Sequence, residues 1–124
     1  MRWMRPRVLI VDDHSGFRRL AGVVLAAAGY DVVGEAGDAA SGLRAAHELA
    51  PDVVLLDIGL PDASGFDVLT ALTGGAGAPA VVLISSRAAD DYGARVACSP
   101  ARGFLTKAEL SPEALDALLR EAGP

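Results

Sequence analysis

The stretch Pro51-Asp52-Val53-Val54-Leu55-Leu56-Asp57 places four branched apolar residues directly before an acid. An apolar run of this length, without alternation, is typical of a strand that is buried on both faces of a parallel sheet. Residues 8–11 and 81–84 repeat the pattern, residues 103–106 form a shorter run, and residues 31–36 form a more polar run typical of an edge strand. The sequence therefore predicts five strands.

The segments between these runs carry apolar residues at helical spacing. We expect helices in five segments: Phe17 to Ala28 before Gly29, Ala39 to Leu49 before Pro51, Val68 to Leu72 before Gly74, a weaker one within Ala88 to Ser99, and Leu115 to Ala122 after the capping Ser111. Because strand and helix alternate and parallel crossovers are right-handed, the compact solution is a three-layer α/β sandwich. We predict the flavodoxin-like (βα)5 arrangement, with a parallel five-stranded sheet in the order 2-1-3-4-5.

The composition is that of one globular domain. The chain has 124 residues, of which 52% are hydrophobic and 22% are charged, and this supports a single core of ordinary size. We expect the domain to span residues 7–122, with an N-terminal extension at residues 1–6. Residues 123–124 would be a tail or the start of a linker.

The charge and the single cysteine restrict the expected partners and location. With a net charge of −5, the chain has no positive field that would draw it to nucleic acid or to an anionic membrane. Cys98, the lone cysteine, can form neither an internal disulfide nor a zinc cluster, so we expect a reducing compartment, the cytoplasm. The apolar run at residues 8–11 is too short for a secretion signal, and no run approaches the ~20 residues that a membrane helix needs.

Polar side chains follow the buried runs at the point where each predicted strand ends. Asp12 and Asp13 follow the first run, Asp57 the second, Ser85 the third and Lys107 the last. Ligands of an open parallel sheet bind beyond the carboxyl ends of its strands, where the strand order reverses. In the order 2-1-3-4-5 the first and third strands are neighbours, so we expect the three acids to share one pocket with the hydroxyl and the lysine at its rim.

Three carboxylates this close together repel one another, and an uncompensated one would hold a proton at neutral pH. Lys107 supplies one positive charge, and a hard divalent cation with oxygen ligands would supply two, so Mg²⁺ is the expected cofactor. Taken alone, Asp12-Asp13 is more often a helix start, because aspartate caps helices. The combination with Asp57, Ser85 and Lys107 at separate strand ends favours a site.

The sequence resembles the receiver domain of bacterial two-component response regulators from about Arg7 to Ala122. The resemblance is carried by these motifs: Val8-Leu9-Ile10-Val11-Asp12-Asp13-His14, Pro51 to Asp57, Leu60-Pro61 with Gly65, Ser85, and Gly103-Phe104-Leu105-Thr106-Lys107. The segments at residues 12–14, 33–36 and 101–105 are most similar to the subgroup that usually carries a helix-turn-helix output domain. The resemblance implies a signalling switch that controls an output such as transcription.

The resemblance also implies roles for individual residues. Asp57 would be the phosphoacceptor, which attacks a phosphohistidine on a partner sensor histidine kinase. Asp13 would hold Mg²⁺ directly and Asp12 through water, with Asp57 and the backbone carbonyl of Gly59 as further ligands. Lys107 would pair with one phosphoryl oxygen, and Ser85 would hydrogen-bond another. The domain would be regulatory and not an enzyme in its own right, apart from catalysing its own phosphorylation and a slow hydrolysis.

Ser85 and Phe104 are the switch residues that the resemblance implies. Phosphorylation would pull the Ser85 hydroxyl inward and open space for the Phe104 ring, which changes the surface of the 88–99 segment, the strand at 103–106 and the last helix. The same surface could join two copies of the chain in a homodimer. The chain departs from the family in two respects: Phe104 lacks a tyrosine hydroxyl, and Ala108 stands where a proline with a cis peptide is frequent.

Other functions stay open at this stage. A receiver-like binding module that does not depend on phosphorylation would keep the same fold. A phosphohydrolase of the haloacid dehalogenase type also uses an aspartyl phosphate, but its acids follow an Asp-x-Asp pattern, whereas Asp12 and Asp13 are adjacent. FMN binding rests on fold analogy alone, since no phosphate-cradling loop follows the first strand. His14 is interpreted as a helix-start residue because Mg²⁺ prefers oxygen ligands.

Overall fold

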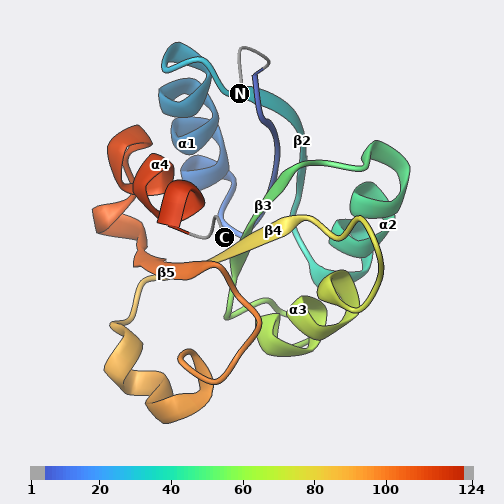
Figure 1. The fold of residues 1–124 in the computed structure, drawn as a ribbon, viewed down its shortest axis with the longest axis vertical. Helices are drawn as coiled ribbons and strands as arrows, with labels where there is room; N and C mark the ends of the chain where they lie inside the picture. Colours follow the sequence, from blue (N-terminus) through green and yellow to red (C-terminus); the bar gives the residue numbers. More distant parts are fainter. Residues whose placement is uncertain (1–4, 122–124) are drawn as a thin grey trace.

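The structure is a computed structural model that describes residues 5–121 of the chain. Its centre is a parallel sheet in the order β2-β1-β3-β4-β5, as the sequence predicts (Figure 1). The strands are β1 (Arg7–Val11), β2 (Asp31–Ala36), β3 (Val53–Asp57), β4 (Ala80–Ser85) and β5 (Gly103–Thr106). Residues 1–4 of the predicted extension and residues 122–124 at the other end lie outside the described residues.

Helices cover both faces of the sheet and complete the predicted three layers (Figure 1). They are α1 (Ser15–Ala27), α2 (Ala39–Leu49), α3 (Gly65–Thr73), α4 (Pro112–Glu121) and two 3₁₀ helices, η1 (Ala89–Arg95) and η2 (Lys107–Glu109). Helices α2 and α3 pack on one face of the sheet, and α1 and α4 pack on the other. No helix of the described part of the chain is long and apolar enough to cross a membrane.

The apolar runs form the core because alternate residues of each strand point to opposite faces. Leu9 and Val54 belong to the core under α2 and α3, whereas Val8 and Leu55 belong to the core under α1 and α4. All five residues of β3 are buried. Burial of each large apolar side chain is worth roughly 1.5–3 kcal/mol, so these strands form a rigid support for whatever stands at their ends.

The helix expected between residues 88 and 99 is only a short 3₁₀ helix, η1, instead of an α-helix. Gly93 interrupts it with φ 60° and ψ −137°, a conformation that side chains other than glycine rarely adopt. None of its residues is buried, so packing does not compensate for the break. This segment is therefore held less firmly than the four α-helices of residues 5–121.

Candidate functional site

The carboxyl edge of the sheet brings the predicted acids together. Val11 of β1 pairs with Leu56 of β3, so Asp12 and Asp57, which come next in each strand, stand side by side. Asp12, Asp13, His14 and Asp57 each offer one ligand atom, and these atoms all lie within 4.8 Å of one another. Asp12 is fully buried and Asp57 is 5% exposed, whereas Asp13 and His14 are exposed. The cluster therefore has a buried floor and an open mouth.

Lys107 reaches the same cluster from the end of β5. Its Nζ lies 2.7 Å from Asp12 Oδ2 and 3.6 Å from Asp57 Oδ2, and it sits 5.0 Å from the centroid of the Phe17 ring. The turn that carries it is fixed by a capping box. The Thr106 hydroxyl accepts the backbone N–H of Glu109, and the Glu109 carboxylate accepts the backbone N–H of Thr106. The ammonium is thus held between the two buried carboxylates. The Lys107–Ala108 peptide is trans, since no described peptide bond is cis.

The loop after β3 fixes the position of the Asp57 side chain. The backbone N–H of Gly59 donates to Asp57 Oδ1 at 3.0 Å, and Gly65 N donates to the carbonyl of Ile58 at 2.9 Å. Gly65 has to be glycine, because a Cβ there would lie 2.6 Å from the Asp57 carbonyl oxygen. Asp62 ties the loop to α2 by accepting the backbone N–H of Ala39 at 2.7 Å. Backbone geometry therefore presents one Asp57 oxygen to Gly59 and leaves Oδ2 near Lys107.

Asp12 is held by the start of α1 and by an arginine. Its Oδ1 accepts the backbone N–H of His14 at 2.8 Å, and Arg18 donates to its backbone carbonyl at 2.6 Å. Arg18 also pairs with Glu35 at 3.0 Å, which connects the end of β1 to β2. The hydrogen bond to the start of α1 thus uses only Oδ1 of Asp12. Its Oδ2 points into the cluster.

The electrostatic balance of the cluster is negative. Burial raises the pKa of the Asp57 carboxyl, and the charges of Asp12 and Asp13 raise it further, while the Gly59 N–H and Lys107 lower it. Asp12 Oδ2 is buried and makes no hydrogen bond in the described residues, although Lys107 Nζ is close enough for an ion pair. Three carboxylates face one ammonium. The cluster is therefore short of positive charge and of hydrogen-bond donors.

Ser85 and Phe104 stand beside this cluster and not in it. Ser85 is the last residue of β4 and is 3% exposed; its Oγ lies 2.6 Å from Tyr92 Oη and accepts the Arg87 backbone N–H at 3.0 Å. The Phe104 ring lies 6.2 Å from the Tyr92 ring, centroid to centroid. In the described residues, Ser85 makes no hydrogen bond to the acids.

Sequence reasoning missed two contributors to this region. Tyr92 lies within the segment 88–99, where the sequence predicts only a weak helix, and nothing in the spacing shows that its hydroxyl meets Ser85. His14 is the N-cap of α1, as expected of a helix-start residue, but its Nδ1 also lies 3.2 Å from Lys107 Nζ. Its position directly after two acids was the one available signal.

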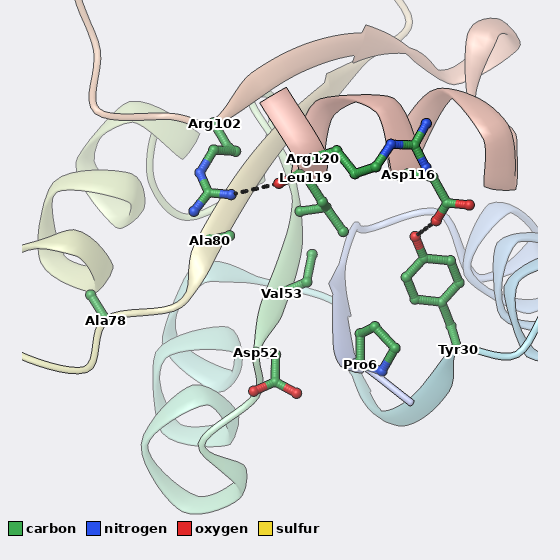
Figure 2. Close-up of a pocket in the computed structure, with 10 residues that line it drawn as sticks. All are labelled: Pro6, Tyr30, Asp52, Val53, Ala78, Ala80, Arg102, Asp116, Leu119 and Arg120. Carbon is green, nitrogen blue, oxygen red and sulfur yellow. Dashed lines mark hydrogen bonds between the residues drawn. The ribbon is translucent and has the colours of Figure 1, made fainter. Parts of the chain in front are cut away.

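A second hollow lies at the opposite, amino edge of the sheet (Figure 2). It is an open pocket of about 650 Å³, lined by Pro6, Tyr30, Asp52, Val53, Ala78, Ala80, Arg102, Asp116, Leu119 and Arg120. The Tyr30 hydroxyl donates to Asp116, and Arg102 donates to the carbonyl of Leu119 at 3.3 Å. Asp52 accepts the backbone N–H of Arg7 at 2.9 Å. The polar groups that line this pocket are thus largely paired within the protein.

Comparison with known proteins identifies relatives of the chain. A family model described as the response regulator receiver domain matches residues 8–120. The transcriptional regulatory protein KdpE of Mycobacterium tuberculosis is 49% identical over 76 residues, which are 61% of this chain and 33% of that protein. The DNA-binding response regulator MtrA of the same organism is 41% identical over 83 residues, which are 67% of this chain and 36% of that protein. The matches thus span about a third of the length of these two relatives.

Solved structures show the same architecture. The chemotaxis response regulator CheY4 of Vibrio cholerae superposes with a TM-score of 0.79 and 25% sequence identity. The superposition covers 95% of this chain and 98% of that one. The similarity therefore extends over nearly the whole chain.

Proposed function

Because the chain belongs to the family of response regulator receiver domains, we propose that it is a phosphorylation-controlled switch whose phosphoacceptor is Asp57. The family is regulatory and not a family of independent catalysts. The phosphoryl donor would be a phosphohistidine on a sensor histidine kinase. The observation that carries the proposal is that Asp57 lies beside Asp12, Asp13 and Lys107 in one cluster of net negative charge.

The chemistry assigned to Asp57 is an in-line displacement at phosphorus. The Gly59 N–H holds Oδ1, which leaves Oδ2, 3.6 Å from Lys107 Nζ, as the attacking oxygen. The new bond forms between this oxygen and phosphorus, while the bond from phosphorus to the histidine nitrogen breaks and its electron pair stays with the imidazole. Lys107 would then pair with a phosphoryl oxygen instead of Asp12, and Ser85 would donate to another.

The cluster has the donor set of a Mg²⁺ site. Its carboxylates are the hard oxygen ligands that Mg²⁺ prefers, and the exposed mouth at Asp13 leaves room for water. The buried Asp12 Oδ2 supports the fit, because its one close cation in the described residues is the Lys107 ammonium at 2.7 Å, which three carboxylates face. Asp12, Asp13, Asp57 and the Gly59 carbonyl would hold the ion. When bound, Mg²⁺ neutralises charge on the oxygens of the transferring phosphoryl group.

The output of the switch would be the surface formed by η1, β5 and α4. All four residues of β5 are only partly buried, and η1 has no buried residue, so this surface is held less firmly than the acid cluster. A homodimer through this surface and control of transcription by an attached or separate output domain are parts of the proposal. So is a cytoplasmic location. The domain bounds 7–122 stay a prediction, and the family match covers residues 8–120.

The test is phosphorylation by a small donor. We expect acetyl phosphate with Mg²⁺ to add one phosphoryl group to the wild-type chain, measured by intact-protein mass. Asp57→Asn keeps the shape but removes the nucleophile and should not be labelled. Asp116→Asn, a matched change at the opposite edge of the sheet, should be labelled normally.

Equal labelling of wild type and Asp57→Asn would refute the proposal. A partner that binds equally well to wild type and to Asp57→Ala would instead favour a binding module that does not depend on phosphorylation.

A further inference from the structure

The hydroxyl of Ser85 is engaged by a residue of the segment that the switch would move. Ser85 Oγ lies 2.6 Å from Tyr92 Oη, and Tyr92 belongs to η1. In residues 5–121, Ser85 is the one hydrogen-bond partner of the Tyr92 hydroxyl. A polar link therefore runs from the end of β4 directly to η1.

This link is one of few anchors of η1. Tyr92 and Val96 are the apolar residues of this region that pack against the core under α2 and α3, both are partly exposed, and the Arg95 guanidinium lies 4.2 Å from the centroid of the Phe66 ring. The Tyr92 ring lies 6.0 Å from the ring of Phe66 and 6.2 Å from the ring of Phe104, centroid to centroid. Because Gly93 breaks the helix one residue later, backbone hydrogen bonding cannot replace these contacts. The hydroxyl pair is thus the polar contact that joins η1 to the end of β4, beside the ring and Arg95 contacts to Phe66.

A phosphoryl group on Asp57 would compete for the same hydroxyl. In its present position the Ser85 hydroxyl bonds Tyr92 and the Arg87 N–H and makes no hydrogen bond to the acids in the described residues, so Oγ has to move to donate its one proton to a phosphoryl oxygen. Turning Ser85 Oγ towards a phosphoryl oxygen moves it away from a contact of 2.6 Å. Hydrogen bonds to charged acceptors are roughly twice as strong as neutral ones, so the phosphoryl oxygen wins this competition.

We propose that Tyr92 is a latch: its hydroxyl holds Ser85 and η1 together in the unphosphorylated chain and releases η1 when Ser85 turns to the phosphorylated site. This inference rests on the proposed function and names its regulation. It also gives the switch a hydroxyl that Phe104 does not supply. Tyr92 is a positioning residue, because it acts through Ser85 and not on the phosphoryl group.

The test compares Tyr92→Phe with wild type by hydrogen–deuterium exchange. The variant removes only the hydroxyl and keeps the ring between Phe66 and Phe104. In the unphosphorylated chain we expect the amides of residues 88–96 to exchange roughly threefold to tenfold faster than in wild type, the effect of losing one net hydrogen bond. Tyr30→Phe, whose hydroxyl binds Asp116 at the opposite edge, should leave this segment unchanged.

Phosphorylation with acetyl phosphate and Mg²⁺ provides the second arm. Exchange in residues 88–96 should accelerate on phosphorylation in wild type and change little in Tyr92→Phe, because the latch is already absent. An equal response of both chains, or no difference between the unphosphorylated chains, would overturn the latch. If wild type is not labelled on Asp57, the proposed function and the release step fail together, while the unphosphorylated comparison still decides whether the hydroxyl holds η1.

Discussion

The two edges of the sheet hold similar numbers of charged groups but differ in how these groups are paired. At the amino edge, Tyr30 donates to Asp116 and Arg102 donates to a backbone carbonyl, so most polar groups around the pocket are paired (Figure 2). At the carboxyl edge, Asp12 and Asp57 are buried beside each other with one ammonium between them. The pKa of Asp57 is raised, and the buried Oδ2 of Asp12 has only the shared Lys107 ammonium beside it in the described residues.

The two edges therefore differ in electrostatic balance, and the proposed function rests on this difference and not on the size of a hollow. The amino-edge pocket has a volume of about 650 Å³, within the range of small-molecule sites, and most of its polar groups are paired within the protein. At the acid cluster, by contrast, three carboxylates face one ammonium, so added positive charge would be favourable. Changes at the carboxyl edge should therefore alter chemistry, whereas matched changes at the amino edge should alter stability at most.

The largest effect is expected for Lys107→Met. This variant removes the ammonium that would stabilise the transferring phosphoryl oxygens, so the rate of labelling by acetyl phosphate should fall about a hundredfold or more, the scale of losing one such donor. Arg102→Met, at the amino edge, should stay within about twofold of wild type because its side chain is paired away from the chemistry. Similar rates for both variants would remove the distinction between the edges.

A smaller effect is expected for Mg²⁺ binding. Asp13→Asn replaces a charged ligand at the exposed mouth of the cluster, and we expect the affinity for Mg²⁺ to fall at least about tenfold. Isothermal titration calorimetry measures it, with Asp116→Asn as the control that should bind like wild type. An unchanged affinity in Asp13→Asn would place the ion elsewhere.

Removing a polar group should raise the free energy of unfolding at the carboxyl edge and lower it at the amino edge. A carboxyl whose pKa is raised on folding destabilises the protein once it ionises, so Asp57→Asn should unfold at higher urea than wild type at pH 7 in EDTA, by on the order of 1 kcal/mol. Tyr30→Phe removes a satisfied hydrogen bond and should lose about 1 kcal/mol.

The stability difference between wild type and Asp57→Asn should depend on pH. The native state binds the Asp57 proton more tightly than the unfolded state, so wild type loses stability relative to Asp57→Asn as the pH rises from the ordinary carboxyl value of 3.8 to the raised pKa. A constant difference across that range would show that ionisation of Asp57 is not the cause.

The smallest effect is expected for Arg102→Ala. The hydrogen bond of its side chain to Leu119 is exposed and 3.3 Å long, so urea unfolding should change by less than about 0.5 kcal/mol. A loss several times larger would mean that the amino edge depends on this arginine more than its contacts indicate.

Much of the fold could be predicted because residues 53–56 and their counterparts are apolar without alternation. Such strands must be covered on both faces, and the handedness of crossovers then leaves few strand orders. The meeting of Asp12 with Asp57 followed from strand order alone, because both acids stand where neighbouring strands end. The sequence could not show that Lys107 Nζ would lie 2.7 Å from Asp12, since this depends on the turn after β5.

Three features that the sequence did not predict depend on local conformation: the form of η1, the Ser85–Tyr92 contact and the amino-edge pocket. Residues 88–99 carry enough apolar residues to suggest a helix, but Gly93 and weak packing reduce it to η1. The contact of Ser85 with Tyr92 depends on how η1 folds back and on side-chain rotamers, which no periodicity encodes. The amino-edge pocket joins residues from six separate segments and has no signature in sequence.

Chemical trapping of the phosphorylated residue tests the central claim most directly. After labelling with acetyl phosphate and Mg²⁺, borohydride reduces an aspartyl phosphate to homoserine, which peptide mass mapping locates. We expect homoserine at position 57 alone, and none when Mg²⁺ is chelated. Homoserine at the position of another aspartate, or equal labelling with and without Mg²⁺, would contradict the assignment of the acid cluster as the phosphoryl-accepting site.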